Sequence, residues 1–329
     1  MSGHAQARLR VFEPLEYLQP DGFAYRSWRG HVYPPFIDPD QAQRLIDTWD
    51  TDAHDVFICT HQKVGTHLMK KFVVEVLRAL YGFPSDHPMR DGDIGHGAVP
   101  WPEVMASQHG IAHVEAFLQR TAGVPRVWYL HCPADVLPMR TVHPGARFVC
   151  VYRDPRAVAV SQYFFYKAHP LLQVPADLTL ERFVDLFVGG GLYFGDYHQH
   201  TLDWLSGCHG RVAPQQMLAL RYEELVEEKP AVVDALARHL GPGTTLSPER
   251  RDAIAASTAF AAMKDSITAN PGTFHFNPST FFRAGRTDDW TNHLTPSQVD
   301  RIDAKSARVW GAGHVSAPAL PSCRTLHQP

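Results

Sequence analysis

Residues 55–81 constrain the fold of this chain more than any other stretch. They begin with a short apolar run at 56–59, which has the length and composition of a buried strand. A polar turn follows at 60–66, and apolar residues then recur at helical spacing between Leu68 and Leu80. The pattern predicts a strand, a tight turn and an amphipathic helix in immediate succession.

The turn carries groups that suit an anion. The free N–H groups of the first helical turn point into it, and the helix dipole adds positive potential there. Gly65 allows close approach of the backbone, Thr66 adds a hydroxyl and Lys63 adds a full charge. The turn is neither a Walker A loop, which needs another glycine and a Lys-Ser/Thr pair, nor a dinucleotide fingerprint. From this stretch alone, an ordinary strand-to-helix connection with a surface lysine stays open.

Composition excludes several classes of protein. The chain has 329 residues, of which 44% are hydrophobic and 20% charged, as in a soluble globular protein. Its net charge of -3 gives no reason to expect a nucleic-acid partner. No apolar run approaches the length of a membrane span, and the N-terminus lacks a signal-peptide core. The five cysteines are widely spaced and odd in number, which argues against a disulfide framework and favours the cytoplasm.

A second strand, predicted at 127–130, ends at His131. In open α/β sheets ligands bind beyond the carboxyl ends of strands, so we expect His131 and Lys63 to share a cleft. The chain holds 20 histidines, so on position alone a surface or core role for His131 stays open. Cys132 beside it makes a poor nucleophile–base pair, because adjacent residues on an extended chain point to opposite faces. The spacing of the cysteines and histidines matches no usual zinc pattern, so we expect no metal site.

A third strand is predicted at 148–152, and Arg153 follows its end. Asp154 and Pro155 suit the N-cap and first position of a helix that carries Ser161 two turns in. Arg153 and Ser161 are therefore expected to reach one anion. A carboxylate partner for the arginine and a packing role for the serine remain the alternative.

The remaining segments are less regular. Residues 1–54 read as an irregular lead-in with one helix after Asp38-Pro39, and 82–124 as a long loop or lid with a short helix at 111–120. A further strand-turn-helix unit begins at 217, and a last helix begins after Thr295, with Gln298 completing a capping box.

Six short blocks stand out in order: Lys63-Val64-Gly65-Thr66-His67-Leu68; Leu130-His131-Cys132-Pro133; Arg153-Asp154-Pro155 with Ser161; Tyr222-Glu223-Glu224-Leu225; Thr258, Phe260, Met263 and Lys264; and Arg283-Ala284-Gly285 before Asp289-Trp290. Together they resemble the cytosolic-type sulfotransferases, which use 3′-phosphoadenosine 5′-phosphosulfate (PAPS). The resemblance implies an α/β fold in which a central, mostly parallel sheet is flanked by helices and carries a P-loop-like phosphosulfate-binding loop. It also implies a single domain, 1–329, with a core at 55–310 and a C-terminal tail at 311–329.

The chain departs from the family's blocks at several positions. Val64 replaces a serine, His67 a phosphate-binding threonine and Leu68 a tryptophan. Tyr129 stands where the family often has a lysine near the acceptor, and Ala284 where it has a lysine near the 3′-phosphate. The family's C-terminal dimer signature is not apparent, so no dimer is predicted.

The resemblance also implies roles for these residues. His131 is expected to act as general base, and Lys63 to stabilise the leaving phosphate together with the loop amides. The loop 63–68 is expected to hold the 5′-phosphosulfate. The other donor contacts fall into two groups: Arg153, Ser161, Arg283, Ala284 and Gly285 around the 3′-phosphate, and Tyr222, Thr258 and Phe260 around the adenine. The product nucleotide is adenosine 3′,5′-bisphosphate (PAP).

The acceptor is expected to be a small molecule with an alcohol or phenol hydroxyl, hydrophobic or aromatic in character. Its predicted lining is aromatic: Phe23, Tyr25, Trp28, Tyr33, the 82–110 loop, and the segments 164–169 and 192–197. Two alternatives stay open. One is a nucleotide kinase or other P-loop-like NTPase; the other is a nucleotide-binding homologue without catalytic activity.

Overall fold

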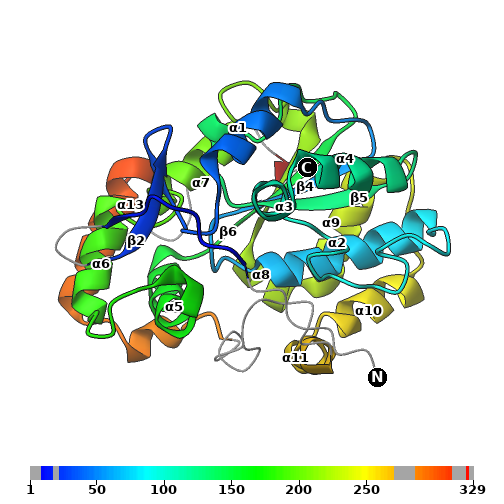
Figure 1. Cartoon of the computed structure of the whole chain (residues 1–329). Helices are drawn as coiled ribbons and strands as arrows, with labels where there is room; N and C mark the ends of the chain where they lie inside the picture. Colours follow the sequence, from blue (N-terminus) through cyan, green and yellow to red (C-terminus); the bar gives the residue numbers. More distant parts are fainter. Residues whose placement is uncertain (1–8, 18–21, 270–285, 313–323, 326–329) are drawn as a thin grey trace.

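The computed structural model describes residues 9–17, 22–269, 286–312 and 324–325. Its centre is a five-stranded sheet in the order β5-β4-β6-β7-β8, and every neighbouring pair is parallel (Figure 1). The strands are β4 (Asp55–Thr60), β5 (Arg126–Leu130), β6 (Arg147–Tyr152), β7 (Met217–Arg221) and β8 (Arg324–Thr325). The predicted α/β fold with a central parallel sheet is confirmed.

Helices cover both faces of this sheet (Figure 1). Their bounds are α1 Pro39–Thr48, α2 Thr66–Tyr81, α3 Pro102–His109, α4 Ile111–Arg120, α5 Pro155–Ala168, α6 Leu180–Gly189, α7 Tyr197–Leu205, α8 Tyr222–Glu227, α9 Lys229–Leu240, α10 Pro248–Ser257, α11 Phe260–Ala269 and α13 Pro296–Trp310. Successive strand residues point to opposite faces, so Val56 and Ile58 pack with α2, α5 and α9, while Phe57 and Cys59 pack with α1, α4 and α7. Nearly every residue of β4 to β7 is buried, which explains why these strands read as continuous apolar runs.

The predicted helix starts are present. The side chain of Asp154 accepts a hydrogen bond from the N–H of Arg156, and Pro155 opens α5. Thr295 and Gln298 form the expected capping box at the start of α13. The predicted helix at 111–120 is α4 with the same bounds.

Two predictions about irregular segments were wrong. The lead-in contains a three-stranded antiparallel sheet of β1 (Glu16–Tyr17), β2 (Ala24–Trp28) and β3 (His31–Tyr33). The supposed loop between 82 and 110 contains α3, which carries no polar–apolar stripe because most of its residues are buried. The β1–β3 sheet and α3 both form through tertiary packing, so neither shows a local pattern of alternating polar and apolar residues. No helix in the described ranges is long and apolar enough to cross a membrane.

Candidate active site

Four parallel strands deliver the candidate residues to one edge of the sheet. Lys63 follows β4, His131 follows β5, Arg153 follows β6 and Tyr222 follows β7. Because these strands are neighbours in the order β5-β4-β6-β7, the residues that follow their carboxyl ends gather at one edge of the sheet. One cavity is lined by them and by further predicted residues: Lys63, Gly65, Thr66, His67, Leu68, His131, Arg153, Ser161, Tyr222, Thr258 and Phe260.

One predicted donor residue of the described ranges, Val64, does not line this cavity. Val64 is fully buried and packs into the core beneath the loop. Arg283, Ala284 and Gly285 lie outside the described residues. The structure therefore brings together the predicted donor residues of the loop, of α5 and of the α8–α11 region.

The loop before α2 has a backbone that few sequences can adopt. Lys63 has φ 68° and Gly65 has φ 110°, both in the left-handed region. A Cβ on Gly65 would lie 2.5 Å from Cδ2 of Tyr222, so only glycine fits beneath that ring. The loop leads directly into the first turn of α2, whose backbone N–H groups have no partner within the helix and suit an anion.

Arg153 joins the loop to a distant part of the chain. Its Nη1 donates to the carbonyl of Lys63 and its Nη2 to the carbonyl of Arg286, each at 3.2 Å. The guanidinium lies 4.1 Å from the ring centroid of Tyr222, a cation–π contact. Its Nε is buried and has no hydrogen-bond partner among the described residues. Arg153 is thus held over the cavity with donor capacity left for a ligand.

His131 is fixed in one orientation. Its Nδ1 lies 2.8 Å from the carbonyl oxygen of Thr60, which can only accept, so Nδ1 carries the proton and Nε2 is left as the basic nitrogen. The hydroxyl of Thr60 lies 2.9 Å from that of Thr66, which links this histidine to the first residue of α2. Burial lowers the pKa of His131 to about 3, opposed by the hydrogen bond to Thr60. The imidazole is therefore neutral at neutral pH.

Several lining residues were not in the predicted donor or catalytic set. They include Gln62, His96, Trp101, Phe165, His169, Lys229 and Arg286. His96, Trp101, Phe165 and His169 fall in segments predicted to line the acceptor site, so their composition did signal them. Lys229, at the start of α9, and Arg286 carried no such signal, because a charged residue outside a recognised motif is usually solvated.

Part of the predicted acceptor lining was wrong. Phe23 and Tyr33 are buried in the core, with 1% of each exposed, and Tyr193 and Tyr197 are buried in the same way. The lead-in reaches the cavity through Leu9 and Phe36 instead. The aromatic content of the lead-in thus served packing rather than binding.

A metal site is absent from the part of the chain that the structure describes, since no cluster of three or more His, Cys, Asp or Glu side chains is placed to hold an ion. His61 is buried and His67 is half-buried at the cavity wall, and loss of contact with water lowers the pKa of each well below the usual value for histidine. Both rings are therefore neutral at neutral pH.

Comparison with known proteins identifies the family. Residues 53–310 match the profile of the Sulfotransferase domain. The chain belongs to this family. The 3-beta-hydroxysteroid sulfotransferase of Cavia porcellus is 27% identical over 274 residues, which cover 81% of this chain and 87% of the relative. Sulfotransferase 2B1 of Rattus norvegicus is 29% identical over 300 residues, covering 89% and 81% respectively.

Solved structures share the fold. Mouse sulfotransferase SULT7A1 complexed with PAP has a TM-score of 0.64 at 21% identity, covering 87% of this chain and 94% of that one. Retinol dehydratase in complex with androsterone and PAP has a TM-score of 0.60 at 18% identity, covering 90% and 96%. The predicted enzyme class, a sulfotransferase with PAPS as co-substrate, is confirmed by the family; the roles of individual residues remain predictions.

Proposed function

We propose that this enzyme moves the sulfuryl group of PAPS to the hydroxyl of a small hydrophobic acceptor, with His131 as general base. The observation that carries the proposal is the fixed imidazole. The carbonyl of Thr60 holds Nδ1–H, so Nε2 is the proton acceptor in the same cavity as Lys63 and Arg153. A general base needs this combination of neutral state and fixed direction.

The proposed step is an in-line displacement. The acceptor oxygen attacks sulfur while its proton passes to Nε2 of His131. The bond between sulfur and the phosphate oxygen of the donor breaks, and its electron pair stays on the phosphate of PAP. Lys63 and the N–H groups that begin α2 stabilise this developing charge, as preorganised donors do in phosphoryl transfer.

Donor recognition is assigned to the edge formed by β6 and β7. Arg153 and Ser161 hold the 3′-phosphate, for which the unpaired Nε of Arg153 supports a role. Tyr222, Thr258 and Phe260 surround the adenine. Thr258 donates its hydroxyl proton to the carbonyl of Ala255, which leaves the hydroxyl oxygen as an acceptor for the exocyclic amine of the base.

The acceptor side of the cavity supports a neutral, ring-containing hydroxyl compound. The lining at this side includes Phe36, Trp101 and Phe165, with histidines His96 and His169 as the polar groups.

The proposal also includes the domain organisation and the compartment. We expect one sulfotransferase domain over 1–329, located in the cytoplasm.

A transfer assay tests the proposal. Radiolabelled PAPS is incubated with phenols, hydroxysteroids and simple alcohols, with and without a chelator. We expect chelator-independent transfer to at least one hydrophobic hydroxyl, and a fall of about 10²–10⁴-fold in the His131→Ala variant. That variant should still be stabilised by PAP in a thermal shift assay, and ATP should stabilise either form less.

The outcomes separate the alternatives. Chelator-sensitive phosphoryl transfer from ATP would favour the kinase. PAP binding without any transfer would favour the non-catalytic homologue. Full activity in His131→Ala would show that the base is another group.

A further inference from the structure

Lys70 is an unusual residue for the interior of a protein. It lies in α2, one turn after Thr66, and none of its surface is exposed. Its Nζ has no hydrogen-bond partner among the described residues. An isolated ammonium in such a place is costly, because burial disfavours the charged form. The cation–π contact with Tyr129 offsets only part of this cost, which suggests that the residue serves a ligand.

The ammonium lies at the wall of the active-site cavity. Side chains on a helix lean toward its N-terminus, so the Lys70 side chain runs back toward the anion-binding first turn of α2. Its Nζ is 4.5 Å from the ring centroid of Tyr129, and that ring lines the cavity beside His131. Tyr129 and His131 have ring centroids 5.4 Å apart. The ammonium of Lys70 is therefore separated from the cavity by the ring of Tyr129, which lies next to His131.

The groups that face Lys70 do not neutralise it. His67 on the same helix and His131 after β5 are both held toward their neutral forms, in part by this charge. The hydroxyl of Tyr129 contacts Nδ1 of His96 at 3.1 Å. Burial lowers the pKa of Lys70 to about 7, and the charge of Asp93 opposes this shift. In the absence of a ligand, the amine is only partly protonated at neutral pH.

We propose that Lys70 is an electrostatic positioning residue of the donor site, which takes up a proton and becomes fully charged when the sulfuryl-bearing end of the donor binds. This inference rests on the proposed function. The sulfuryl group of the bound donor extends from the first turn of α2 toward His131 and carries a negative charge there, and a nearby negative charge favours the ammonium. By linkage, the donor then binds more tightly where the proton is available. Tyr129 keeps the amine out of contact with the acceptor, so the charge acts on the sulfuryl group and on His131 at a distance.

The first test replaces the ammonium without changing the volume. Lys70→Met should raise the melting temperature of the free enzyme, because a buried unpaired amine is removed, yet lower kcat/KM for PAPS by about tenfold or more. Affinity for PAP, which lacks the sulfuryl group, should fall less. Lys71→Met is the matched control, since Lys71 is on the same helix and pairs with Glu75 at 2.6 Å. It should leave kcat/KM unchanged.

The second test follows the proton. Calorimetric binding of PAPS, without acceptor, is measured near pH 7.5 in two buffers of different ionisation enthalpy. Wild type should take up more protons than Lys70→Met, and the excess should be smaller with PAP. The other titratable groups are present in both proteins, and burial keeps His67 and His131 neutral at this pH with or without the charge of Lys70. The difference in proton uptake therefore reports Lys70.

Each outcome decides the inference. Wild-type kcat/KM in Lys70→Met, equal proton uptake in the two proteins, or a loss of activity that only follows a loss of folded protein would overturn it. A wild-type enzyme that neither binds PAP nor transfers sulfuryl would instead overturn the proposed function, and this inference with it.

Discussion

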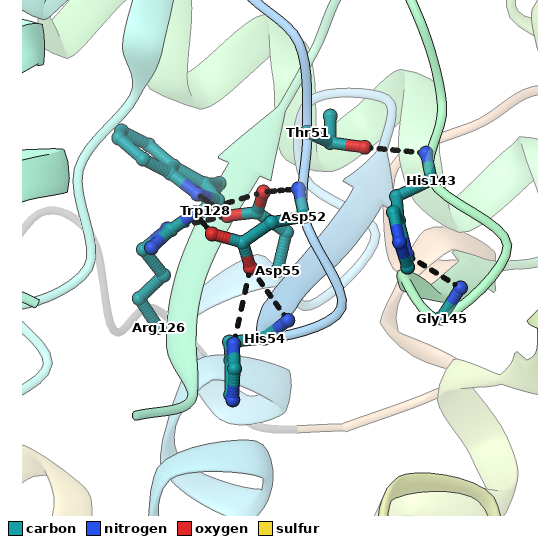
Figure 2. Close-up of polar contacts among 8 residues, drawn as sticks. All are labelled: Thr51, Asp52, His54, Asp55, Arg126, Trp128, His143 and Gly145. Carbon is teal, nitrogen blue, oxygen red and sulfur yellow. Dashed lines mark hydrogen bonds and ion pairs between the residues drawn. The ribbon is translucent and has the colours of Figure 1, made fainter. Parts of the chain in front are cut away.

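The two ends of strands β4 and β5 hold buried charge in opposite ways. At the amino end, Nε of Arg126 donates to Asp55 at 2.6 Å and the indole of Trp128 donates to the same carboxylate at 2.8 Å (Figure 2). Asp52 binds the outer side of the same guanidinium. At the carboxyl end, Lys70 has no hydrogen-bond partner within the described residues.

The difference separates structure from function within one sheet. The amino end is closed: each charge is satisfied by the protein, so little binding capacity remains for a ligand. The carboxyl end is open: buried donors such as Nζ of Lys70 and Nε of Arg153 have no hydrogen-bond partner among the described residues, which costs stability. A site that must receive a highly charged nucleotide needs such groups, and the closed end shows that the chain is able to pair buried charges where it has no ligand to bind.

Breaking the closed end should have the largest effect on stability. Asp55→Ala leaves Arg126 buried with Asp52 as its remaining carboxylate, and we expect a loss of about 3–5 kcal/mol in the free energy of unfolding. Urea unfolding measures this loss, and PAP affinity of the folded protein should not change. Asp91→Ala, at an exposed pair with Arg90, is the control and should leave the midpoint unchanged. Equal midpoints for the two variants would remove the contrast between the ends.

At the carboxyl end of the sheet, Lys63→Ala should lower activity without unfolding the protein. The charge at the turn before α2 is lost, so kcat should fall by about 10²–10³-fold, while the melting temperature stays near that of wild type. Lys167→Ala, on α5 and outside the cavity lining, is the matched control. A large drop in melting temperature with little change in kcat would mean that this lysine belongs to the structure rather than to the reaction.

Arg153→Ala should distinguish the contribution of the 3′-phosphate to binding from that of the 5′-phosphate. Because the guanidinium is assigned to the 3′-phosphate, PAP affinity should fall by about tenfold or more, whereas affinity for adenosine 5′-monophosphate should fall much less. Arg156→Ala changes a neighbouring arginine that pairs with Asp154, and it should affect both nucleotides equally. A uniform loss in Arg153→Ala would assign this residue to the loop geometry, which it also holds through the carbonyl of Lys63.

The sequence predicted what is encoded locally. The run 56–59 and the stripe from Leu68 to Leu80 were sufficient for β4 and α2, because an apolar period and a tight turn need no distant partner. The caps at Asp154 and Thr295 were readable for the same reason. Lys63, His131 and Arg153 were found because each directly follows a strand, and the resemblance supplied their roles.

Features that depend on tertiary packing could not be predicted from the sequence. No local pattern distinguishes Lys70 from the adjacent Lys71, and its complete burial involves Tyr129, which is far away in the sequence. The lead-in aromatics, such as Phe23 and Tyr33, have the composition of a binding surface but are core residues. Helix α3 was missed because burial on most sides removes the polar–apolar alternation on which such predictions depend.

Glu103 should give the smallest effect, visible as a pH dependence. It is buried in the first turn of α3, and burial raises its pKa to about 7, above the usual value of 4.5. The folded state therefore binds more protons than the unfolded state between these values, so the contribution of Glu103 to stability is complete below about pH 4.5 and is lost as the pH rises through 7. Lys70 has the opposite shift, and its contribution rises with pH from about 7 to 10.5.

Glu103→Gln keeps the shape of the side chain and removes the titration. Its melting temperature at pH 8 should exceed that of wild type by a few degrees, and the two should converge near pH 5, because there the wild-type carboxyl is neutral as well. Thermal unfolding at both pH values measures this. If the difference in melting temperature between variant and wild type were the same at both pH values, Glu103 would be neutral or paired in both conditions. The unpaired charges at the carboxyl end of the sheet would then be only those of the residues that face the nucleotide.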